Sequence, residues 1–283
     1  MNKTRITQKK VQKSSMTTEN IGNYAAINGL QLYYEIYGEG KPLLLLPGAL
    51  SGIRTAFGKL IPLLARERQV IAIEFQGYGH TTDISERPLS YEQLAEDVIE
   101  LLRVLKVSQT DIFGYSTGAG VALQIAIRKP QVVRKLILAS ASYKSSGRHP
   151  ELKTLFSPEF MEEALKGSPY EAEYMTAAAK PEDWHRHIAK VRTFEQKIQD
   201  WSADEISKIK APALIIAGDA DIVQPEHVVA LYKLFGGGSL GELSMPTSQL
   251  AILPGTMHTA LTQKTDLLMA MIPGFLEDGV AYE

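Results

Sequence analysis

Residues 112–122 constrain the fold of this chain more than any other stretch. An apolar run there leads into Gly-x-Ser-x-Gly and then, without a turn signal, into small and aliphatic residues at helical spacing. A strand, a sharp turn and a helix are the context in which this motif presents a reactive serine, here Ser116. We expect Gly114 and Gly118 to be required because so tight a turn leaves no room for side chains two positions either side. Gly120 is expected to extend the bare surface by which the helix approaches the sheet.

Length and composition describe an ordinary globular protein. A chain of 283 residues with 45% hydrophobic and 22% charged residues can bury a sizeable core, as one large domain or as a core with a smaller insert. With a net charge of −2, the chain lacks the positive charge excess that would attract nucleic acid or an anionic membrane. We therefore expect a small, mostly uncharged substrate as partner, and a monomer or homodimer.

The chain has no cysteine, which excludes disulfides, thiol chemistry and thiolate metal sites and suits a reducing, cytoplasmic compartment. Residues 1–20 are basic but lack the apolar stretch of a secretory signal, so we expect a disordered tail there. No apolar run is long enough to span a bilayer.

Strand and helix patterns alternate along most of the chain. Asn28-Gly29 between two alternating segments, 24–27 and 30–37, predicts a hairpin. The wholly apolar run 42–46 predicts a strand buried on both faces, which is typical of a parallel sheet covered by helices. Further strands are predicted at 70–74, 111–115, 136–139, 212–218 and 250–253. Helices are predicted at 55–66 (interrupted by Pro62), 90–105 (opened by a capping box of Ser90 and Gln93), 117–128, 226–235 and 263–276. The alternation predicts an α/β fold with a mostly parallel sheet flanked by helices.

Residues 143–207 differ in character from the rest of the chain. They are helical in pattern, rich in Glu, Lys and Ala, broken by prolines, and contain no stretch typical of a buried strand. A helical segment inserted between two strands of one sheet is expected to form a lid over the carboxyl edge of the sheet, where such sheets bind ligands. The expected core is then residues 21–142 together with 208–283.

A nucleophilic serine needs a base and an orienting acid, which in this architecture follow it in the order Ser, Asp or Glu, His. Asp221 comes just after the apolar run 214–217, and His258 comes just after the run 251–253. Asp219 is the competing acid. Among the other histidines, His80 lies on a loop near the expected site and is favoured as a supporting or lid contact. His185 and His187 have a spacing that does not place both on one helical face, so no metal site is predicted, and His149 and His227 carry no signal.

With these residues in place, the chain resembles the α/β-hydrolase superfamily, specifically its lidded, cofactor-free members, over residues 21–277 apart from the lid. The resemblance implies Ser116 as nucleophile, His258 as general base and Asp221 as the acid that fixes the imidazole. It implies an oxyanion hole made by the backbone N–H groups of Ala49 and Thr117. It also implies neither a metal nor an organic cofactor.

The chain departs from the pattern of these relatives at three places. The expected oxyanion loop begins Pro47-Gly48-Ala49, where many relatives have His-Gly. Gln76 stands where an arginine is common. Ser140 follows the strand at 136–139, at a place where some relatives keep their catalytic acid.

A serine at this turn, where some relatives carry aspartate, favours acyl transfer. The expected function is that of a serine hydrolase acting through an acyl-serine on a small carboxylic ester or lactone. Carbon–carbon bond hydrolysis, aminopeptidase activity and perhydrolysis use the same three side chains and remain alternatives. Glutamates that would recognise the amine of a peptidase substrate are available in the lid, at Glu159, Glu162, Glu163, Glu171 and Glu173. A hydrolase fold that serves as a small-ligand receptor is the alternative outside enzymes.

Overall fold

The computed structural model describes residues 22–197, 199–241, 243 and 245–277, so the predicted tail of residues 1–20 lies outside the described part. Within it, an eight-stranded sheet has the order β1-β2-β4-β3-β5-β6-β7-β8. The strands are β1 Gly22–Ile27, β2 Leu30–Tyr37, β3 Lys41–Leu46, β4 Arg68–Ile73, β5 Thr110–Tyr115, β6 Val133–Ala139, β7 Ala213–Ala220 and β8 Gln249–Met257. Only the pairs β1–β2 and β2–β4 are antiparallel, which confirms the mostly parallel α/β sheet.

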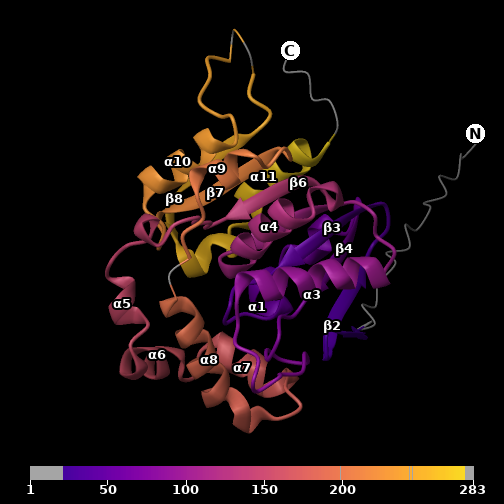
Figure 1. The fold of residues 1–283 in the computed structure, drawn as a ribbon, viewed down its shortest axis with the longest axis vertical. Helices are drawn as coiled ribbons and strands as arrows, with labels where there is room; N and C mark the ends of the chain where they lie inside the picture. The colour runs from indigo at the N-terminus through magenta and orange to yellow at the C-terminus, as the bar shows by residue number, and fades with distance from the viewer. Residues whose placement is uncertain (1–21, 198, 242, 244, 278–283) are drawn as a thin grey trace, which may run out of the picture.

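Helices cover both faces of this sheet (Figure 1). In the core they are α1 Ile53–Phe57, α2 Ile61–Leu64, α3 Tyr91–Val104, α4 Thr117–Arg128, α10 Pro225–Leu234 and α11 Thr265–Leu276, with the 3-10 turns η1 Pro130–Val132 and η4 His258–Gln263. None of the described helices combines the length and the apolar character that a membrane crossing needs.

The central strand β3 shows why its sequence is continuously apolar. Leu44 belongs to the hydrophobic cluster on one face of the sheet, whereas Leu43 and Leu45 belong to the cluster on the other face. All three are fully buried. Because side chains alternate between the two faces of a strand, a strand covered by helices on both sides has no position left for a polar residue.

The predicted hairpin is confirmed. Asn28 and Gly29 both have positive φ values, 46° and 83°, as a tight two-residue turn requires. Strands β1 and β2 then pair in register from Ile27 and Leu30 outward.

Three local predictions were wrong in part. The expected helix at 55–66 is two short helices, because Pro62 has no N–H to continue a helix and instead occupies the first turn of α2. Ser90 caps α3 by accepting the Gln93 N–H at 3.1 Å, but the Gln93 side chain donates to Asp97, so the capping box is not completed. Strand β8 continues through Pro254 to Met257, where a loop was expected.

Gly120 also differs from its expected role. A Cβ at this position would lie 2.3 Å from the ring of Tyr91 on α3, so the bare surface faces a neighbouring helix rather than the sheet. Tyr91 thereby packs directly on the first turns of α4.

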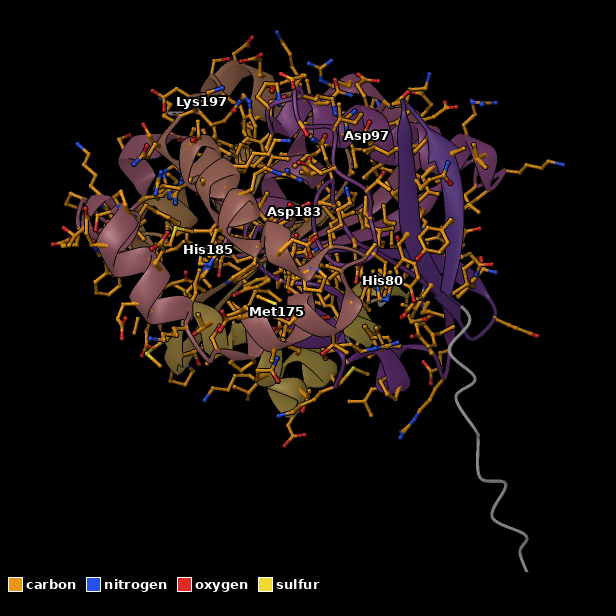
Figure 2. All side chains as sticks on the ribbon, turned by 90° about the horizontal axis from the view of Figure 1, so that it is seen from below. His80, Asp97, Met175, Asp183, His185 and Lys197 are labelled. Carbon is orange, nitrogen blue, oxygen red and sulfur yellow. The ribbon has the colours of Figure 1, made fainter. Side chains whose placement is uncertain are left out.

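Between β6 and β7 the described residues form helices and no named strand. The helices of this insert are α5 Leu152–Leu155, α6 Pro158–Leu165, α7 Pro169–Ala177, α8 Trp184–Gln196 and α9 Ala203–Ser207, with the 3-10 turns η2 Ser145–Gly147 and η3 Pro181–Asp183. Figure 2, seen from below, shows the part of the insert that carries Met175, Asp183, His185 and Lys197, beside the strands of the N-terminal hairpin.

Glu173 of α7 fixes the insert to the core. Its carboxylate accepts hydrogen bonds from the backbone N–H groups of Gly52, Arg54 and Thr55, at 3.2, 2.7 and 3.0 Å, and from the Thr55 hydroxyl. A Cβ on Gly52 would lie 2.5 Å from this carboxylate, so the contact requires glycine. One side chain of the insert thus satisfies several backbone donors at the start of α1.

Candidate active site

Ser116 lies at the turn between β5 and α4, in the strained conformation that the motif predicts. Its φ of 55° and ψ of −119° are unusual for a residue other than glycine. A Cβ on Gly114 would lie 2.3 Å from the Gly118 carbonyl oxygen, and a Cβ on Gly118 would lie 2.1 Å from the Leu46 carbonyl oxygen. Backbone therefore meets backbone on both sides of the serine, which explains both glycines.

Three side chains from distant parts of the chain meet at the carboxyl edge of the sheet. Nε2 of His258 lies 3.0 Å from Oγ of Ser116, and Nδ1 of the same ring lies 2.8 Å from Oδ1 of Asp221. Asp221 comes directly after β7 and His258 directly after β8. The structure thus brings Ser116, His258 and Asp221 into one chain of contacts, with the histidine between the other two.

Asp219 has a different set of partners. It accepts hydrogen bonds from the backbone N–H groups of Gly255 and Thr256, at 2.9 and 3.0 Å, and ties β7 to the last residues of β8. These bonds, that from Thr256 first, lower the pKa of Asp219. The contact also accounts for the continuation of β8 beyond the run that the sequence predicted.

The carboxylate of Asp221 is almost completely buried and well supplied with donors. Oδ1 accepts from the Ile222 N–H as well as facing His258, while Oδ2 accepts from the Gly218 N–H and the Ser140 hydroxyl. Burial raises the pKa of this group, but its hydrogen bond with His258 and the other donors outweigh burial, so the pKa lies below its usual value. Asp221 is therefore held as a carboxylate.

Ser140 is a supporting residue whose contact the sequence did not predict. It has a positive φ of 55° at the end of β6, and its hydroxyl donates to Asp221. We expect Ser140→Ala to lower kcat for an ester about 3- to 30-fold, because it removes one donor that orients Asp221 and favours its charged form. Ser140→Thr, which keeps the hydroxyl, is the matched control. Equal losses in the two variants, measured as kcat over a pH series, would contradict this role.

The histidine is positioned from its other side by Tyr115, the residue before Ser116. The Tyr115 hydroxyl donates to the His258 carbonyl oxygen at 2.8 Å, and the two rings lie 5.2 Å apart. The motif itself contains this tyrosine, so only its contact, and not its position, was beyond prediction.

The loop that begins Pro47-Gly48-Ala49 lies beside the serine. A Cβ built on Gly48 would lie 3.5 Å from Cβ of Ser116, and the loop turns back through a 3.2 Å bond from the Ser51 N–H to the Gly48 carbonyl. Among the described residues, neither the Ala49 N–H nor the Thr117 N–H donates a hydrogen bond. Thr117 opens α4, where unpaired backbone N–H groups favour negative charge.

A cavity of about 20 Å³ adjoins Ser116. It is lined by Tyr91, Ser116, Thr117, Gly120, Ser140, Ser142, Arg148, Glu195, Ile222 and Val223. This volume holds about one water molecule, so a substrate needs some of the lining to move. Arg148 and Glu195, both from the insert, are residues that sequence reasoning missed, since nothing in the pattern around them marks them.

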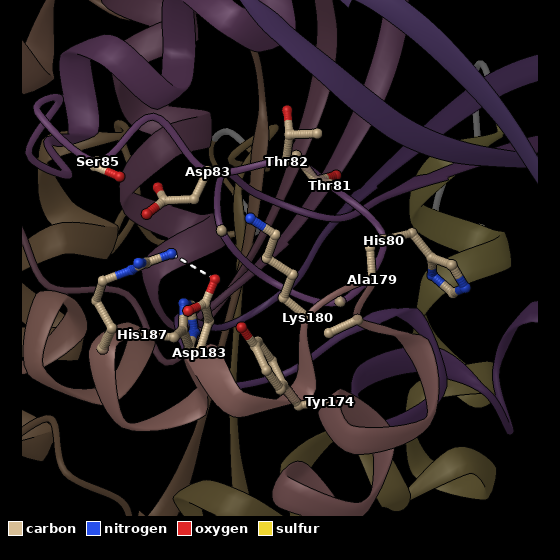
Figure 3. Close-up of a pocket in the computed structure, with 14 residues that line it drawn as sticks. His80, Thr81, Thr82, Asp83, Ser85, Tyr174, Ala179, Lys180, Asp183 and His187 are labelled. Carbon is tan, nitrogen blue, oxygen red and sulfur yellow. Dashed lines mark hydrogen bonds and ion pairs between the residues drawn. The ribbon is translucent and has the colours of Figure 1, made fainter.

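A second, larger cavity of about 290 Å³ lies between the insert and the loop after β4 (Figure 3). His80, Asp83, Lys180, Asp183 and His187 are among its lining residues, whereas Ser116, Asp221 and His258 are not. His80 pairs with Glu74 at 3.2 Å and does not belong to the Ser116 cluster. Among the described residues, no group of three His, Asp or Glu side chains is arranged to hold a metal ion.

Gln76, the residue in the place of a common arginine, holds the loop after β4. Its amide nitrogen donates to Asp83 at 2.9 Å and to the Arg87 carbonyl at 3.0 Å, and its amide oxygen accepts from the Arg87 guanidinium. In this chain the position organises a loop and does not contact Ser116.

Two of the five glutamates that were considered for amine recognition, all in the insert, have structural partners. Glu173 binds the start of α1, and Glu171 accepts the Gly167 N–H. The side chains of Glu159, Glu162 and Glu163 are exposed. No observation among them favours recognition of a substrate amine.

Because His187 of α8 is buried, we expect the protein to lose stability in acid. It is buried among the rings of Tyr78, Tyr174 and Trp184, and its Nε2 has no partner among the described residues. Burial lowers its pKa from 6.5 to about 4, against smaller opposing effects of the Asp83 charge and then of the Ala49 backbone. Between about pH 6.5 and pH 4 the unfolded chain therefore binds a proton at this histidine, whereas the folded chain does not.

The stability that His187 contributes is present above pH 6.5 and is lost as the pH falls toward 4. From this group we expect a loss of about 2 to 3 kcal/mol in the free energy of unfolding between neutral pH and about pH 4.5. His187→Phe should remove that part of the pH dependence in denaturant titrations, whereas His185→Phe, at an exposed position of the same helix, should keep it. The same slope in all three proteins would exclude His187 as the cause.

Comparison with known proteins agrees with this fold. The family model described as the alpha/beta hydrolase fold matches residues 41–181. An uncharacterized hydrolase, YugF, of Bacillus subtilis is 24% identical over 89% of this chain and 96% of its own length. The human serine hydrolase BPHL is 26% identical, over 89% of this chain and 85% of its own.

Among solved structures, a meta-cleavage product hydrolase from Pseudomonas fluorescens superimposes with a TM-score of 0.69 at 20% identity, and the match covers 90% of this chain and 96% of that one. At that identity the likeness concerns the fold alone. Fold, motif and family model agree, and the chain belongs to the α/β-hydrolase superfamily.

Proposed function

We propose that this hydrolase acts on small carboxylic esters or lactones through an acyl-serine intermediate. Ser116 attacks the carbonyl carbon while His258 accepts its proton, and Asp221 stabilises the imidazolium that forms. The backbone N–H groups of Ala49 and Thr117 donate to the oxygen that becomes negative, each stabilising the transition state by a few kcal/mol. The imidazolium then protonates the leaving group, and water, activated by the same histidine, releases the acid.

One observation carries this proposal: a single imidazole touches the serine hydroxyl at 3.0 Å and a buried carboxylate at 2.8 Å. Geometry of this kind converts a weak nucleophile into a reactive one only if the base is neutral and correctly oriented. The contacts of Asp221 and Tyr115 with His258 supply the orientation.

The insert is proposed to act as a lid. Its residues Arg148 and Glu195 line the cavity beside Ser116, and Glu173 attaches it to the start of α1. The small volume of that cavity supports a closed position of the proposed lid.

The proposal is tested by covalent labelling. Diethyl p-nitrophenyl phosphate should release one equivalent of nitrophenolate per protein and add one diethylphosphoryl group, which peptide mass spectrometry should locate on Ser116. Labelling at another residue, or none, would refute the nucleophile. The protein with Ser142→Ala is a suitable control because Ser142 lines the same cavity without touching His258.

Bond type is then settled by one substrate panel. Esters, lactones, thioesters, amino-acid arylamides and a ring-cleavage dienoate are ranked by kcat/KM at one enzyme concentration. We expect an ester or lactone to rank first. A dienoate or arylamide in first place would replace the proposal by carbon–carbon hydrolysis or peptidase activity.

A further inference from the structure

Arg148 and Glu195 form an ion pair in the wall of the cavity that adjoins Ser116. Nη2 of Arg148 lies 2.9 Å from Oε2 of Glu195, and the two side chains are only 18% and 7% exposed. The other oxygen of Glu195 accepts the Thr117 hydroxyl at 3.0 Å, and the guanidinium lies over the ring of Phe156 at 5.6 Å. The pair is thus tied to the residue that directly follows the serine.

This pair lies beside two small spaces, which also share Tyr91 and Ser142 in their linings. The inner cavity, of about 20 Å³, includes Ser116 in its lining, and the outer one, of about 40 Å³, includes Lys197 and Gln199. Arg148 and Glu195 line both cavities. An acyl chain that extends from Ser116 toward the outer cavity must therefore meet the pair.

The two partners differ in what they still offer a ligand. Glu195 is satisfied by Thr117 and Arg148. Arg148 has five N–H donors, yet among the described residues only Nη2 has an acceptor. With Lys197 included, the charged side chains that line the two cavities are two cations and one anion. The lining therefore favours an anion over a cation.

Stability does not account for an arginine at this place. A buried ion pair adds little compared with apolar residues of the same volume, because both charges lose their hydration. An arginine next to a reactive serine has a direct use, since its planar fork matches a carboxylate.

The inner cavity takes up the acyl side of a substrate. His258 must stand beside the leaving group to protonate it, and His258 does not line this cavity, whereas Ser116 and Thr117 do. We propose that Arg148 binds a carboxylate on the acyl part of the substrate, so that half-esters of short dicarboxylic acids, or lactones bearing a carboxylate, are the preferred class. The inference rests on the proposed function and replaces the mostly uncharged substrate that the net charge suggested.

Binding of a substrate carboxylate to Arg148 requires the ion pair between Arg148 and Glu195 to separate. The inner cavity holds only about one water molecule, so its lining must move before a substrate can enter. The substrate carboxylate then replaces Glu195 as the partner of the Arg148 guanidinium, while Glu195 moves away with α8. Thr117 then loses its contact with the lid as the acyl chain enters.

The test compares charged and neutral forms of one acyl chain. The monomethyl esters of succinic, glutaric and adipic acid are measured against the corresponding dimethyl esters at about pH 7.5, where the free carboxyl is ionised. We expect the parent protein to show a higher kcat/KM for the monoester at one chain length at least. Arg148→Gln should lower the ratio of the two kcat/KM values about 10- to 100-fold, as expected for a lost charge-assisted contact.

Three further variants identify the cause. Lys197→Gln removes a positive charge from the outer cavity only, whose lining does not include Ser116, and should lower the ratio by less than about threefold. Glu195→Gln should raise the ratio of kcat/KM for the monoester to that for the diester, because Glu195 no longer competes with the substrate carboxylate for Arg148. The double variant Arg148→Gln/Glu195→Gln removes both charges together, so it guards against misfolding caused by one unpaired buried charge, and should show the same low ratio as Arg148→Gln.

Failure of this inference is distinct from failure of the proposed function. Turnover that depends on Ser116 with a ratio unchanged by Arg148→Gln, or a preference for a trimethylammonium ester, overturns the carboxylate site alone. A calorimetric titration with monomethyl glutarate needs no turnover. If the parent protein binds the ligand and Arg148→Gln weakens that binding more than about tenfold, the site is supported even if no ester is hydrolysed. If the two proteins bind it equally well, the site is overturned.

Discussion

Replacement of Ser116 by alanine is expected to lower kcat for p-nitrophenyl butyrate by at least about 10⁴-fold. The attacking atom is then absent, and His258 loses the hydroxyl that lies 3.0 Å from Nε2. Any remaining rate comes from binding and from donors near the oxyanion position. Stopped-flow and steady-state rates of nitrophenolate release give the comparison, with circular dichroism to show that the fold persists.

Ser116→Gly sharpens this experiment because it separates chemistry from strain. The serine has a φ of 55°, which costs a residue with a Cβ about 1 kcal/mol and costs glycine almost nothing. We therefore expect Ser116→Gly to be as inactive as Ser116→Ala but more stable than it by about 1 kcal/mol in urea titrations. The conformation that exposes the hydroxyl is thus maintained at the expense of stability.

Ser142→Ala is the matched control, since that hydroxyl lines the same cavity but does not touch His258. Its kcat should fall less than about tenfold. Comparable losses in Ser116→Ala and Ser142→Ala would mean that the cavity, and not one nucleophile, decides activity, and the proposed mechanism would be wrong.

The fold was predictable from the sequence because its signals are local. Two glycines around Ser116, an apolar run at β3 and the Asn-Gly turn each restrict a few consecutive residues, and the structure has the expected element at each. The order of serine, acid and base along the chain then identified candidates that lie in contact. Such signals need no knowledge of what packs against what.

The parts that escaped prediction depend on partners far away in sequence. Glu173 meets Gly52 across 121 positions, and Thr117 meets Glu195 across 78. Neither pair has a period, a spacing or a turn residue that would mark it. The same holds for Ser140, whose position after β6 was noticed although its contact with Asp221, 81 positions later, was not foreseen.

Tertiary packing also altered local predictions. Gln93 is placed to complete a capping box, yet its amide finds the buried carboxylate of Asp97, which also binds Arg87. In a capping box the Gln93 amide oxygen would accept the Ser90 N–H, but the charge-assisted bond from the amide nitrogen to Asp97 holds the side chain elsewhere. Pro62 divides a helix for the simpler reason that it lacks an N–H.

The carboxylate opposite His258 provides the second decisive experiment. Asp221→Asn is expected to lower kcat about 10³- to 10⁴-fold, because an amide that donates to Nδ1 holds the imidazole in the tautomer whose Nε2 carries the proton and cannot accept one from Ser116. The substituted side chain has almost the same volume, and its amide oxygen still accepts from the Gly218 N–H and the Ser140 hydroxyl, whereas the Ile222 N–H loses its acceptor. Steady-state kinetics on p-nitrophenyl butyrate measure the loss.

Asp219→Asn supplies the control two residues away. Both substitutions remove one carboxylate from the carboxyl end of β7, but Asp219 accepts from the Gly255 and Thr256 N–H groups and not from the imidazole. We expect its kcat to fall less than about tenfold, with the main effect on the stability of the β7–β8 pairing. If Asp219→Asn were instead the more damaging change, then the 2.8 Å contact between Asp221 and His258 would not be the one that orients the base, and Asp219 would have to reach the ring in the working enzyme.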